Sequence, residues 1–429
     1  MKLKNILSEL GETELQEAIE PFWDQAIVAY PSQGPSFLEP QEFRSSRDYA
    51  GFTAEVDAQL SKMAARIRGN PALSQMAWYC YWRTYECSDP KAGCFPKMEY
   101  ALGQQAGIFH LLIGLAWIPR LRAYHQTLVL PEAVTHETAQ QVRCFSINYH
   151  MAQDGRLGLV CGAYFWLRNY LEGNDYFRIG RFEYWLKPWD LPHFVYRHRN
   201  TGQVVALAGD AVKVTPDGFI DGLSDVQDPA QEWVTSLQIT DTEAKGYLIS
   251  PYGFISRKQV SLSIPEWDCV LKKGDFILDM HIPAGGNMTP DQCGTSMRHA
   301  REFFRRYYPE KHAVAIVCGS WMLSPLLEKI MPPTSNLVRY LRELYLFPIQ
   351  WGGANSLGFI FYQEKFDAAT ALRQTSMQRA VLEYMQAGHV WHNSGMFMLL
   401  DDLDQFGTQP YRSQDTLDNV CKLVVLKTP

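Results

Sequence analysis

Up to about residue 171 the apolar positions of the chain recur every three or four residues, which is the spacing of an amphipathic α-helix. Val56, Leu60, Met63 and Ile67, for example, fall on one helical face. Glycine and proline residues separate the periodic stretches, because they favour turns and helix ends. The pattern predicts helices over residues 53–67, 73–85, 100–117, 131–149 and 159–171.

After Gly173 the chain changes to short aromatic and β-branched segments separated by turns, which is typical of antiparallel strands. Extended segments are expected over residues 176–186, 193–199, 203–207, 212–214, 234–240, 245–249 and 259–264. Further strands are expected over 276–282, 313–318, 359–362 and 396–400, alternating with helices over 289–307, 325–330, 336–345 and 375–387. The sequence therefore predicts an α+β protein, in which a helical part gives way to a mixed part between residues 150 and 175.

Composition and charge narrow the function classes. The 429 residues include 40 Lys and Arg and 46 Asp and Glu, so no basic surplus is present to neutralise the phosphates of a nucleic acid. The 22 Tyr, 22 Phe and 12 Trp side chains supply a large apolar core and exclude a disordered protein. We therefore expect a folded protein without a nucleic-acid partner, and its oligomeric state is left open.

The cysteines and the apolar segments indicate the cellular compartment in which the protein is expected. Nine cysteines, an odd number, are scattered without a disulfide framework, which indicates a reducing environment. Glu9 and Glu12 precede any apolar run, so we expect no signal peptide. The most apolar stretch, residues 108–118, is shorter than the ~20 residues that cross a bilayer. These features favour a cytoplasmic protein without a membrane partner.

The segment with the most chemistry joins a predicted strand to a predicted helix. The glycine pair Gly285 and Gly286 is followed by Asn287 and by Thr289, which fits the N-cap of a helix. Backbone N–H groups at a glycine-rich helix start approach an anion closely, and the helix dipole favours negative charge there. These four residues are the candidate cradle for a pyrophosphate. A plain strand-to-helix turn, in which glycine only supplies flexibility, is the alternative.

Asp279, His281 and Ser320 are the candidate catalytic residues. Asp279 and His281 lie two positions apart on a strand, so their side chains share one face. His281 has the chemistry of a general base near neutral pH, and a histidine buried in the sheet is the alternative. Ser320 follows the next predicted strand, and functional groups of open α/β sheets gather at such strand ends. Its hydroxyl could donate a hydrogen bond to a reacting group, and a serine that caps a turn is the alternative. The spacings of cysteine and histidine predict no metal site.

Several motifs resemble a known family. His281-Ile282-Pro283, Ser320-Trp321-Met322-Leu323-x-Pro325, Ser335-Asn336-Leu337 and Gly180-Arg181-Phe182 are similar to stretches of bacterial acyltransferase-domain proteins. In that family a helical N-acyltransferase-type N-terminal domain precedes a GNAT-like C-terminal domain. The resemblance implies the same two domains here, over residues 1–155 and 156–429, and a largely antiparallel central sheet in the second.

The resemblance also implies a reaction. An acyl group would pass from an acyl-CoA or acetyl-CoA thioester to an amine or hydroxyl of a small-molecule or peptide acceptor. In GNAT folds the pyrophosphate of the CoA lies at the turn between a central strand and the next helix, which corresponds here to the candidate cradle. Asp279 or His281 would deprotonate the acceptor, and Ser320 would protonate the leaving thiolate.

A second hypothesis is a non-catalytic ligand-binding protein on a GNAT-like scaffold. Residues 282–287 lack the basic residue and the spaced glycines that GNAT enzymes carry in this turn. The aromatic surplus offers Trp and Tyr side chains that can line a ligand groove. An open site of CoA size beside residues 285–289 would favour the enzyme, and a turn filled by side chains would favour the binding protein.

Overall fold

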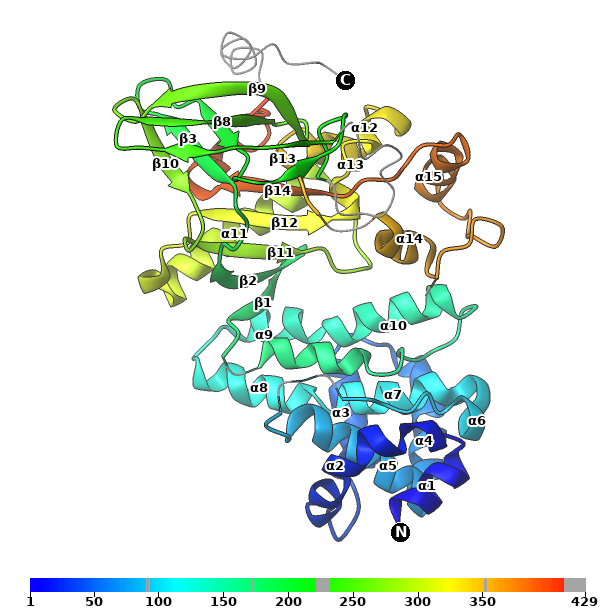
Figure 1. Cartoon of the computed structure of the whole chain (residues 1–429). Coiled ribbons are helices and arrows are strands. Elements are labelled where there is room, and N and C mark those ends of the chain that lie inside the picture. Colours follow the sequence, from blue (N-terminus) through cyan, green and yellow to red (C-terminus); the bar gives the residue numbers. More distant parts are fainter. Residues whose placement is uncertain are drawn as a thin grey trace. The chain divides into compact units, whose positions relative to one another are not determined.

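The computed structural model describes residues 1–89, 91, 93–171, 173–220, 232–350, 353–363 and 365–412. The chain forms two compact units (Figure 1). One, called the helical unit below, holds Met1–Ile179 and Pro283–Gly285. The other, called the mixed unit, holds Gly180–Ile282 and Gly286–Pro429.

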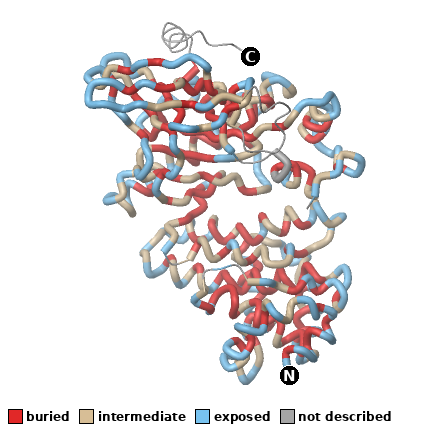
Figure 2. The backbone as a smooth tube through the Cα atoms, in the orientation of Figure 1, coloured by how far each residue is buried: buried red, intermediate tan, exposed pale blue. Residues whose placement is uncertain are grey.

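The helical unit is built around α7, which is buried along its whole length (Figure 2). Its α-helices are α1 (Leu3–Leu10), α2 (Gln16–Val28), α3 (Pro40–Tyr49), α4 (Asp57–Arg68), α5 (Pro71–Tyr85), α6 (Glu99–Leu102), α7 (Ala106–Leu115), α8 (Ile118–Thr127), α9 (Glu132–Ala139) and α10 (Gln141–Ala152). The 3-10 helices η1 (Thr13–Leu15), η2 (Ser36–Leu38), η3 (Ala54–Val56), η4 (Gly103–Gln105) and η5 (Ala163–Tyr170) and the strand β1 (Tyr176–Ile179) complete it.

Local sequence signals start and end these helices. The side-chain oxygen of Asn70 accepts a hydrogen bond of 2.9 Å from the N–H of Leu73, and Pro71 occupies the first turn of α5. Gly103 ends α6 with a φ of 56°, a conformation that favours glycine. The single helix predicted over residues 100–117 is therefore divided into α6, η4 and α7.

One helical stretch in the described part of the chain, Glu99–Thr127, has the length and the apolar composition of a membrane span. Of its most apolar window, 78% is buried inside the protein, as in the core helices of soluble proteins. The stretch is also interrupted between α6, α7 and α8. It is therefore weak evidence for a membrane span.

The mixed unit contains the remaining strands and helices. Its strands are β2 (Phe182–Pro188), β3 (Phe194–His198), β4 (Val204–Leu207), β5 (Lys213–Val214), β6 (Trp233–Val234), β7 (Gln238–Ile239), β8 (Glu243–Ser250), β9 (Phe254–Ser263), β10 (Trp267–Leu271), β11 (Phe276–His281), β12 (Ala315–Ser320), β13 (Tyr345–Pro348) and β14 (Ser394–Leu399). Its helices are α11 (Pro290–Tyr307), η7 (Pro309–Lys311), η8 (Trp321–Leu323), α12 (Leu327–Ile330), α13 (Asn336–Leu341), α14 (Gly353–Phe361), α15 (Ser376–Gln386) and η9 (Leu400–Gln405).

The strands of the mixed unit form a central sheet and a second sheet. The central sheet has the order β2-β11-β12-β14-β13, and of these neighbours only β11 and β12 are parallel. The second sheet has the order β10-β3-β4-β8-β7, with β9 beside β8, and β5 pairs with β6. The prediction of an α+β protein with a largely antiparallel central sheet is confirmed.

Both faces of the central sheet are packed. Helices α11 and α13 cover one face, where the hydroxyls of Tyr184 on β2 and Ser296 on α11 lie 2.9 Å apart. The second sheet covers part of the other face. There the hydroxyl of Tyr345 donates to the carbonyl oxygen of Ile249 at 2.5 Å and accepts from the N–H of Ala206 at 3.1 Å. The Tyr345 hydroxyl therefore joins β13 to β8 and β4.

Several elements differ from the sequence-based expectation. The helices α1, α2, α3 and α8 were not predicted, and the single helix predicted over residues 131–149 is divided into α9 and α10. Residues 359–362, predicted as a strand, belong largely to α14, where Leu357, Ile360 and Phe361 are buried at helical spacing while Phe359 is 70% exposed. The helix predicted over 336–345 ends earlier, and its last residue begins the unpredicted strand β13. The strand β10 was also not predicted.

The helical unit extends to Ile179, beyond the predicted domain boundary at residue 155. Tyr170 of η5 stacks on Tyr176 of β1 with ring centroids 4.2 Å apart, and it meets Trp117 edge-on at 5.5 Å. These buried aromatic contacts join η5 and β1 to the helices, because large aromatic surfaces are stabilised by burial.

Candidate active site

The parallel strands β11 and β12 pair over only the first part of their length. The paired register runs from Ile277 and Ala315 to Asp279 and Val317 and stops there. Beyond this point β11 still pairs with β2, and β12 still pairs with β14, up to the last residue of each strand. The two neighbouring strands therefore diverge toward their C-terminal ends, which is where open α/β sheets bind ligands.

Asp279, His281 and Lys187 form a cluster on one face of the central sheet, called the Asp279 cluster below. The Lys187 Nζ lies 2.6 Å from Asp279 Oδ2, and the His281 Nε2 lies 3.4 Å from the same oxygen. The Asp279 side chain is 18% exposed, whereas that of His281 is 35% exposed. The structure thus brings Asp279 and His281 together, as their spacing in the strand predicts. The imidazole is partly exposed, although its Nε2, which faces Asp279, is buried.

The charge state of Asp279 separates the roles of the two predicted bases. Burial raises the pKa of this carboxyl, but the neighbouring His281 and the positive charge of Lys187 outweigh burial, so the pKa lies below its ordinary value. An ionised carboxylate with a lowered pKa is a poor proton acceptor near neutral pH. The arrangement therefore favours His281 as the base and Asp279 as the group that orients it.

We expect Asp279→Asn to lower the free energy of unfolding by about 1 kcal/mol at pH 7, because Lys187 loses its partner in a pair that solvent partly screens. The pKa of Asp279 is lowered on folding, so its ionised form stabilises the fold above the unfolded pKa of about 3.9. This contribution is lost as the pH falls through the lower folded pKa. Urea unfolding of both proteins near pH 7 and near pH 3 checks the prediction.

The exposed Asp24 provides the control for this measurement. Asp24→Asn should change the free energy of unfolding little at either pH, because substitutions of isolated surface charges have small effects. If Asp279→Asn destabilises the protein equally at both pH values, the stabilising role of the ionised carboxylate is wrong.

Ser320 belongs to the face of the central sheet opposite the Asp279 cluster. Val317 shares the face of Asp279 with which it pairs, and side chains alternate along a strand, so Ser320 points to the other side. Its Oγ accepts a hydrogen bond of 3.2 Å from the N–H of Met322 and caps η8. The structure therefore does not bring Ser320 together with Asp279 and His281, and its role as a proton donor stays a prediction.

Both glycines of the candidate cradle occupy tight positions. In the helical unit Gly285 has a φ of 79°, and a Cβ there would lie 3.0 Å from the Cδ1 of Ile147. In the mixed unit a Cβ on Gly286 would lie 3.1 Å from the Nε of Arg181. The Arg181 side chain also donates to the carbonyl oxygens of Gly286 and Asn287, at 3.4 and 3.1 Å. Close packing is therefore enough to explain why both positions are glycine. Arg181 adds a positive charge to the turn.

Thr289 caps α11 as predicted, since its Oγ1 accepts from the N–H of Gln292 at 3.4 Å. The next residue, Pro290, has no N–H, and Asp291 places a carboxylate in the first turn. These features leave the helix start few donors for an anion. Arg181 is therefore the stronger anion-binding group on the mixed-unit side of the turn, and the cradle itself stays a prediction.

The sequence did not predict that Lys187 and Glu183 lie at the candidate site, nor that Arg181 contacts the glycine turn. Lys187 on β2 pairs with Ile277 and so lies diagonally across from Asp279. Glu183 is buried and pairs directly with His281, which puts both side chains on one face. The register of β2 against β11 is the signal that identifies Lys187 and Glu183, and a single sequence does not supply it.

A cavity of about 760 Å³ lies in the mixed unit near the start of β12 and the end of α11. Its lining includes Lys272, Arg301 and Arg305 and none of the predicted site residues. Arg301 pairs with Asp404 at 2.9 Å, so part of this positive charge is balanced. The cavity therefore lies at the opposite end of the central sheet from the diverging strand ends.

Two protein families match the chain. Residues 42–173 match the N-acyltransferase N-terminal domain, and residues 176–397 match the GNAT-like C-terminal domain. The prediction of these two domain types is thereby confirmed. No curated protein matches the chain with significance.

Solved structures of acyltransferases share this fold. An acyltransferase in complex with CoA and 10C-teicoplanin has a TM-score of 0.60 and 20% sequence identity, over 93% of this chain and 100% of that chain. An acyltransferase mutant in complex with octanoyl-CoA and an acyltransferase in complex with decanoyl-CoA and teicoplanin each have a TM-score of 0.59, with the same identity and coverage. At this identity the likeness establishes the fold.

Proposed function

Because the chain belongs to the family with a GNAT-like C-terminal domain, we propose that it transfers an acyl group from an acyl-CoA thioester to an amine or hydroxyl acceptor. The divergence of β11 and β12 beside the Asp279 cluster carries this proposal. An extended chain with amide groups, such as the pantetheine arm of CoA, pairs with a strand edge as another strand would. In that position the thioester would lie next to His281.

The ligands of the similar structures support the proposed acyl donor and the proposed class of acceptor. They contain CoA, octanoyl-CoA or decanoyl-CoA, which supports an acyl-CoA as the co-substrate. Two of them contain teicoplanin or 10C-teicoplanin, which supports a small-molecule or peptide acceptor. A medium-chain acyl-CoA is therefore the first donor to test.

In the proposed reaction His281 accepts the proton that the amine or hydroxyl of the acceptor loses as it attacks the thioester carbonyl. A C–N or C–O bond forms, the C–S bond breaks, and CoA leaves as a thiolate that takes up a proton. The ionised Asp279 stabilises the imidazolium that forms on His281. General-base catalysis of this kind contributes about 10²- to 10⁴-fold to a rate.

Calorimetric titration with octanoyl-CoA tests the donor site. We expect binding by the unchanged protein and affinity about tenfold weaker for Arg181→Gln, because a charge-assisted contact to a phosphate is lost. The matched control is Arg257→Gln on β9, which should bind octanoyl-CoA as the unchanged protein does. Failure of the folded protein to bind at millimolar octanoyl-CoA would overturn the proposal, and equal affinity of both variants would remove Arg181 from the site.

A non-catalytic ligand-binding protein is the second candidate function. The capped start of α11, with Pro290 and Asp291 in its first turn, favours this candidate because it offers few donors for a pyrophosphate. Release of CoA from octanoyl-CoA in the presence of a panel of primary amines separates the two functions. Tight binding without release under all these conditions would favour the binding protein.

We also propose a reducing, cytoplasmic setting. Among the described cysteines, Cys80, Cys293 and Cys318 are buried free thiols. Burial raises the pKa of Cys80 and Cys318 and raises that of Cys293 to about 12, so these thiols stay protonated and unreactive.

A further inference from the structure

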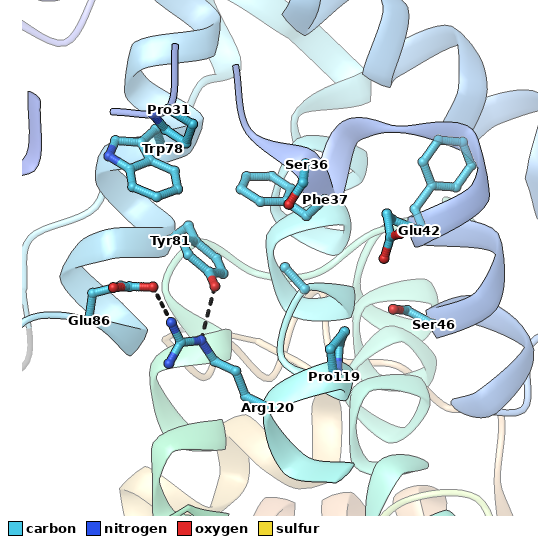
Figure 3. A pocket seen from close by; sticks show the side chains of 12 residues that line it. Pro31, Ser36, Phe37, Glu42, Ser46, Trp78, Tyr81, Glu86, Pro119 and Arg120 are labelled. Atoms are coloured by element: carbon cyan, nitrogen blue, oxygen red, sulfur yellow. Dashed lines mark hydrogen bonds and ion pairs between the residues drawn. The ribbon is translucent and has the colours of Figure 1, made fainter. Parts of the chain in front are cut away.

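The helical unit contains a cavity of about 330 Å³, which is within the range of small-molecule sites. Residues of α3, α5 and α8 and of the segment around η2 line it. Figure 3 shows Trp78, Tyr81, Glu86 and Arg120 on one side and Glu42 and Ser46 on the other, with Phe37 between them. None of the residues proposed for acyl transfer lines this cavity.

Aromatic rings form one wall of the cavity. The rings of Phe37 and Tyr81 stack with centroids 5.1 Å apart, and those of Trp78 and Tyr81 lie 5.3 Å apart. The Trp78 Nε1–H donates to the carbonyl oxygen of Ala26 at 2.8 Å, which fixes the indole and uses its polar hydrogen. The wall therefore offers apolar ring surface, which attracts apolar groups and cations.

Arg120 and Glu86 neutralise each other at the edge of this wall. The Arg120 Nη2 donates to Glu86 Oε1, and its Nε donates to the Tyr81 hydroxyl at 2.9 Å (Figure 3). The guanidinium also lies 5.4 Å from the centre of the Tyr81 ring. Arg120 thus has its charge satisfied within the protein, and the pair contributes little net charge to the cavity.

Glu42 and Ser46 supply the remaining polar groups of the lining. They lie four residues apart, on one face of α3. Among the residues that the structure describes, Glu42 forms no ion pair and the hydroxyl of Ser46 has no hydrogen-bond partner, although Ser46 is only 4% exposed. The nearby Arg44 and Arg47 pair with Asp57, at 3.6 and 2.8 Å, rather than with Glu42, which is exposed to solvent at the edge of the cavity.

We propose that this cavity binds an organic ammonium ion with a compact apolar or aromatic body. The body would lie against the rings of Phe37, Trp78 and Tyr81, and the ammonium group would bind the Glu42 carboxylate and the Ser46 hydroxyl. An aromatic wall combined with a carboxylate at its edge is the chemistry that recognises ammonium groups. This site goes beyond the proposed acyl transfer, because it needs neither acyl-CoA nor the Asp279 cluster.

Titration of the full chain with three probes of equal size tests the proposal: 2-phenylethylamine, which is charged at pH 7, the neutral 2-phenylethanol, and the anionic phenylacetate. We expect the amine to bind at least about tenfold more tightly than the alcohol, and phenylacetate not to bind. Calorimetry reports the binding. Equal affinity for amine and alcohol, no binding of the amine, or tighter binding of phenylacetate than of the amine would each overturn the proposal.

Glu42→Gln removes the charge and keeps the shape of the side chain. We expect about a tenfold loss of affinity for the amine and no change for the alcohol. The matched control is Glu17→Gln, since Glu17 also lies exposed in the first turn of a helix. A Glu42→Gln protein that is folded by circular dichroism and binds the amine as the control does would overturn the assignment of Glu42.

Discussion

Replacing His281 with alanine is expected to lower kcat/KM for acyl transfer by about 10²- to 10⁴-fold, because the acceptor loses its general base. The affinity for octanoyl-CoA should change little, since the proposed pairing of the pantetheine arm uses the backbone of the diverging strands. Chromatographic measurement of CoA released from octanoyl-CoA, with an amine that supports turnover, gives the rate. Titration of the same variant gives the affinity.

His299→Ala is the matched control, because His299 is an exposed histidine of α11 outside the Asp279 cluster. It should leave both the rate and the affinity near those of the unchanged protein. Full turnover by His281→Ala would show that another group deprotonates the acceptor. The directly paired and buried Glu183 would then be the next residue to change.

Tyr345→Phe is expected to lower the free energy of unfolding of the mixed unit by about 1–3 kcal/mol. The substitution removes one hydroxyl that serves two buried backbone groups, the carbonyl of Ile249 and the N–H of Ala206. Ala206 and Ile249 also face each other in the ladder of β4 and β8, so the loss corresponds to the hydroxyl's own hydrogen bonds, about 1–3 kcal/mol in all. Urea unfolding followed by circular dichroism measures the change.

Tyr247 on the neighbouring strand β8 is the control for this substitution. It is half-buried beside Trp233, and among the described residues its hydroxyl joins no pair of buried backbone groups. Tyr247→Phe should therefore cost less than about 1 kcal/mol. Equal destabilisation by the two substitutions would contradict the role of Tyr345 as the link between the sheets.

Periodicity predicted α4, α5, α7 and α11 and most strands, but it missed α1, α2, α3 and α8. It also failed where burial is uniform. Helix α11 has a capping threonine, a proline in its first turn and one buried face, and its predicted range agrees with the structure to one residue. Strand β13 is buried on both faces, so its four residues show no alternation and merge with the helical pattern before them. The apolar run around Phe359 is too short for its period to separate a strand from a helix.

Within the candidate site, the sequence predicted only those relations between side chains that a single strand determines. Alternation along β11 places Asp279 and His281 on one face without any knowledge of their neighbours. The face of Ser320 depends on the register between β11 and β12, and the pairing of Lys187 depends on the register of β2. A register is set by long-range packing, so these relations appear only in the folded chain.

The position of β14 has a consequence for the synthesis of the chain. Among the described residues β14 is the last strand, yet it lies between β12 and β13 in the interior of the central sheet. Until the ribosome has released Ser394–Leu399, both neighbours keep an open edge on the side that β14 will fill. Open strand edges pair with other chains, so premature termination before residue 394 would yield aggregating fragments rather than partly active ones.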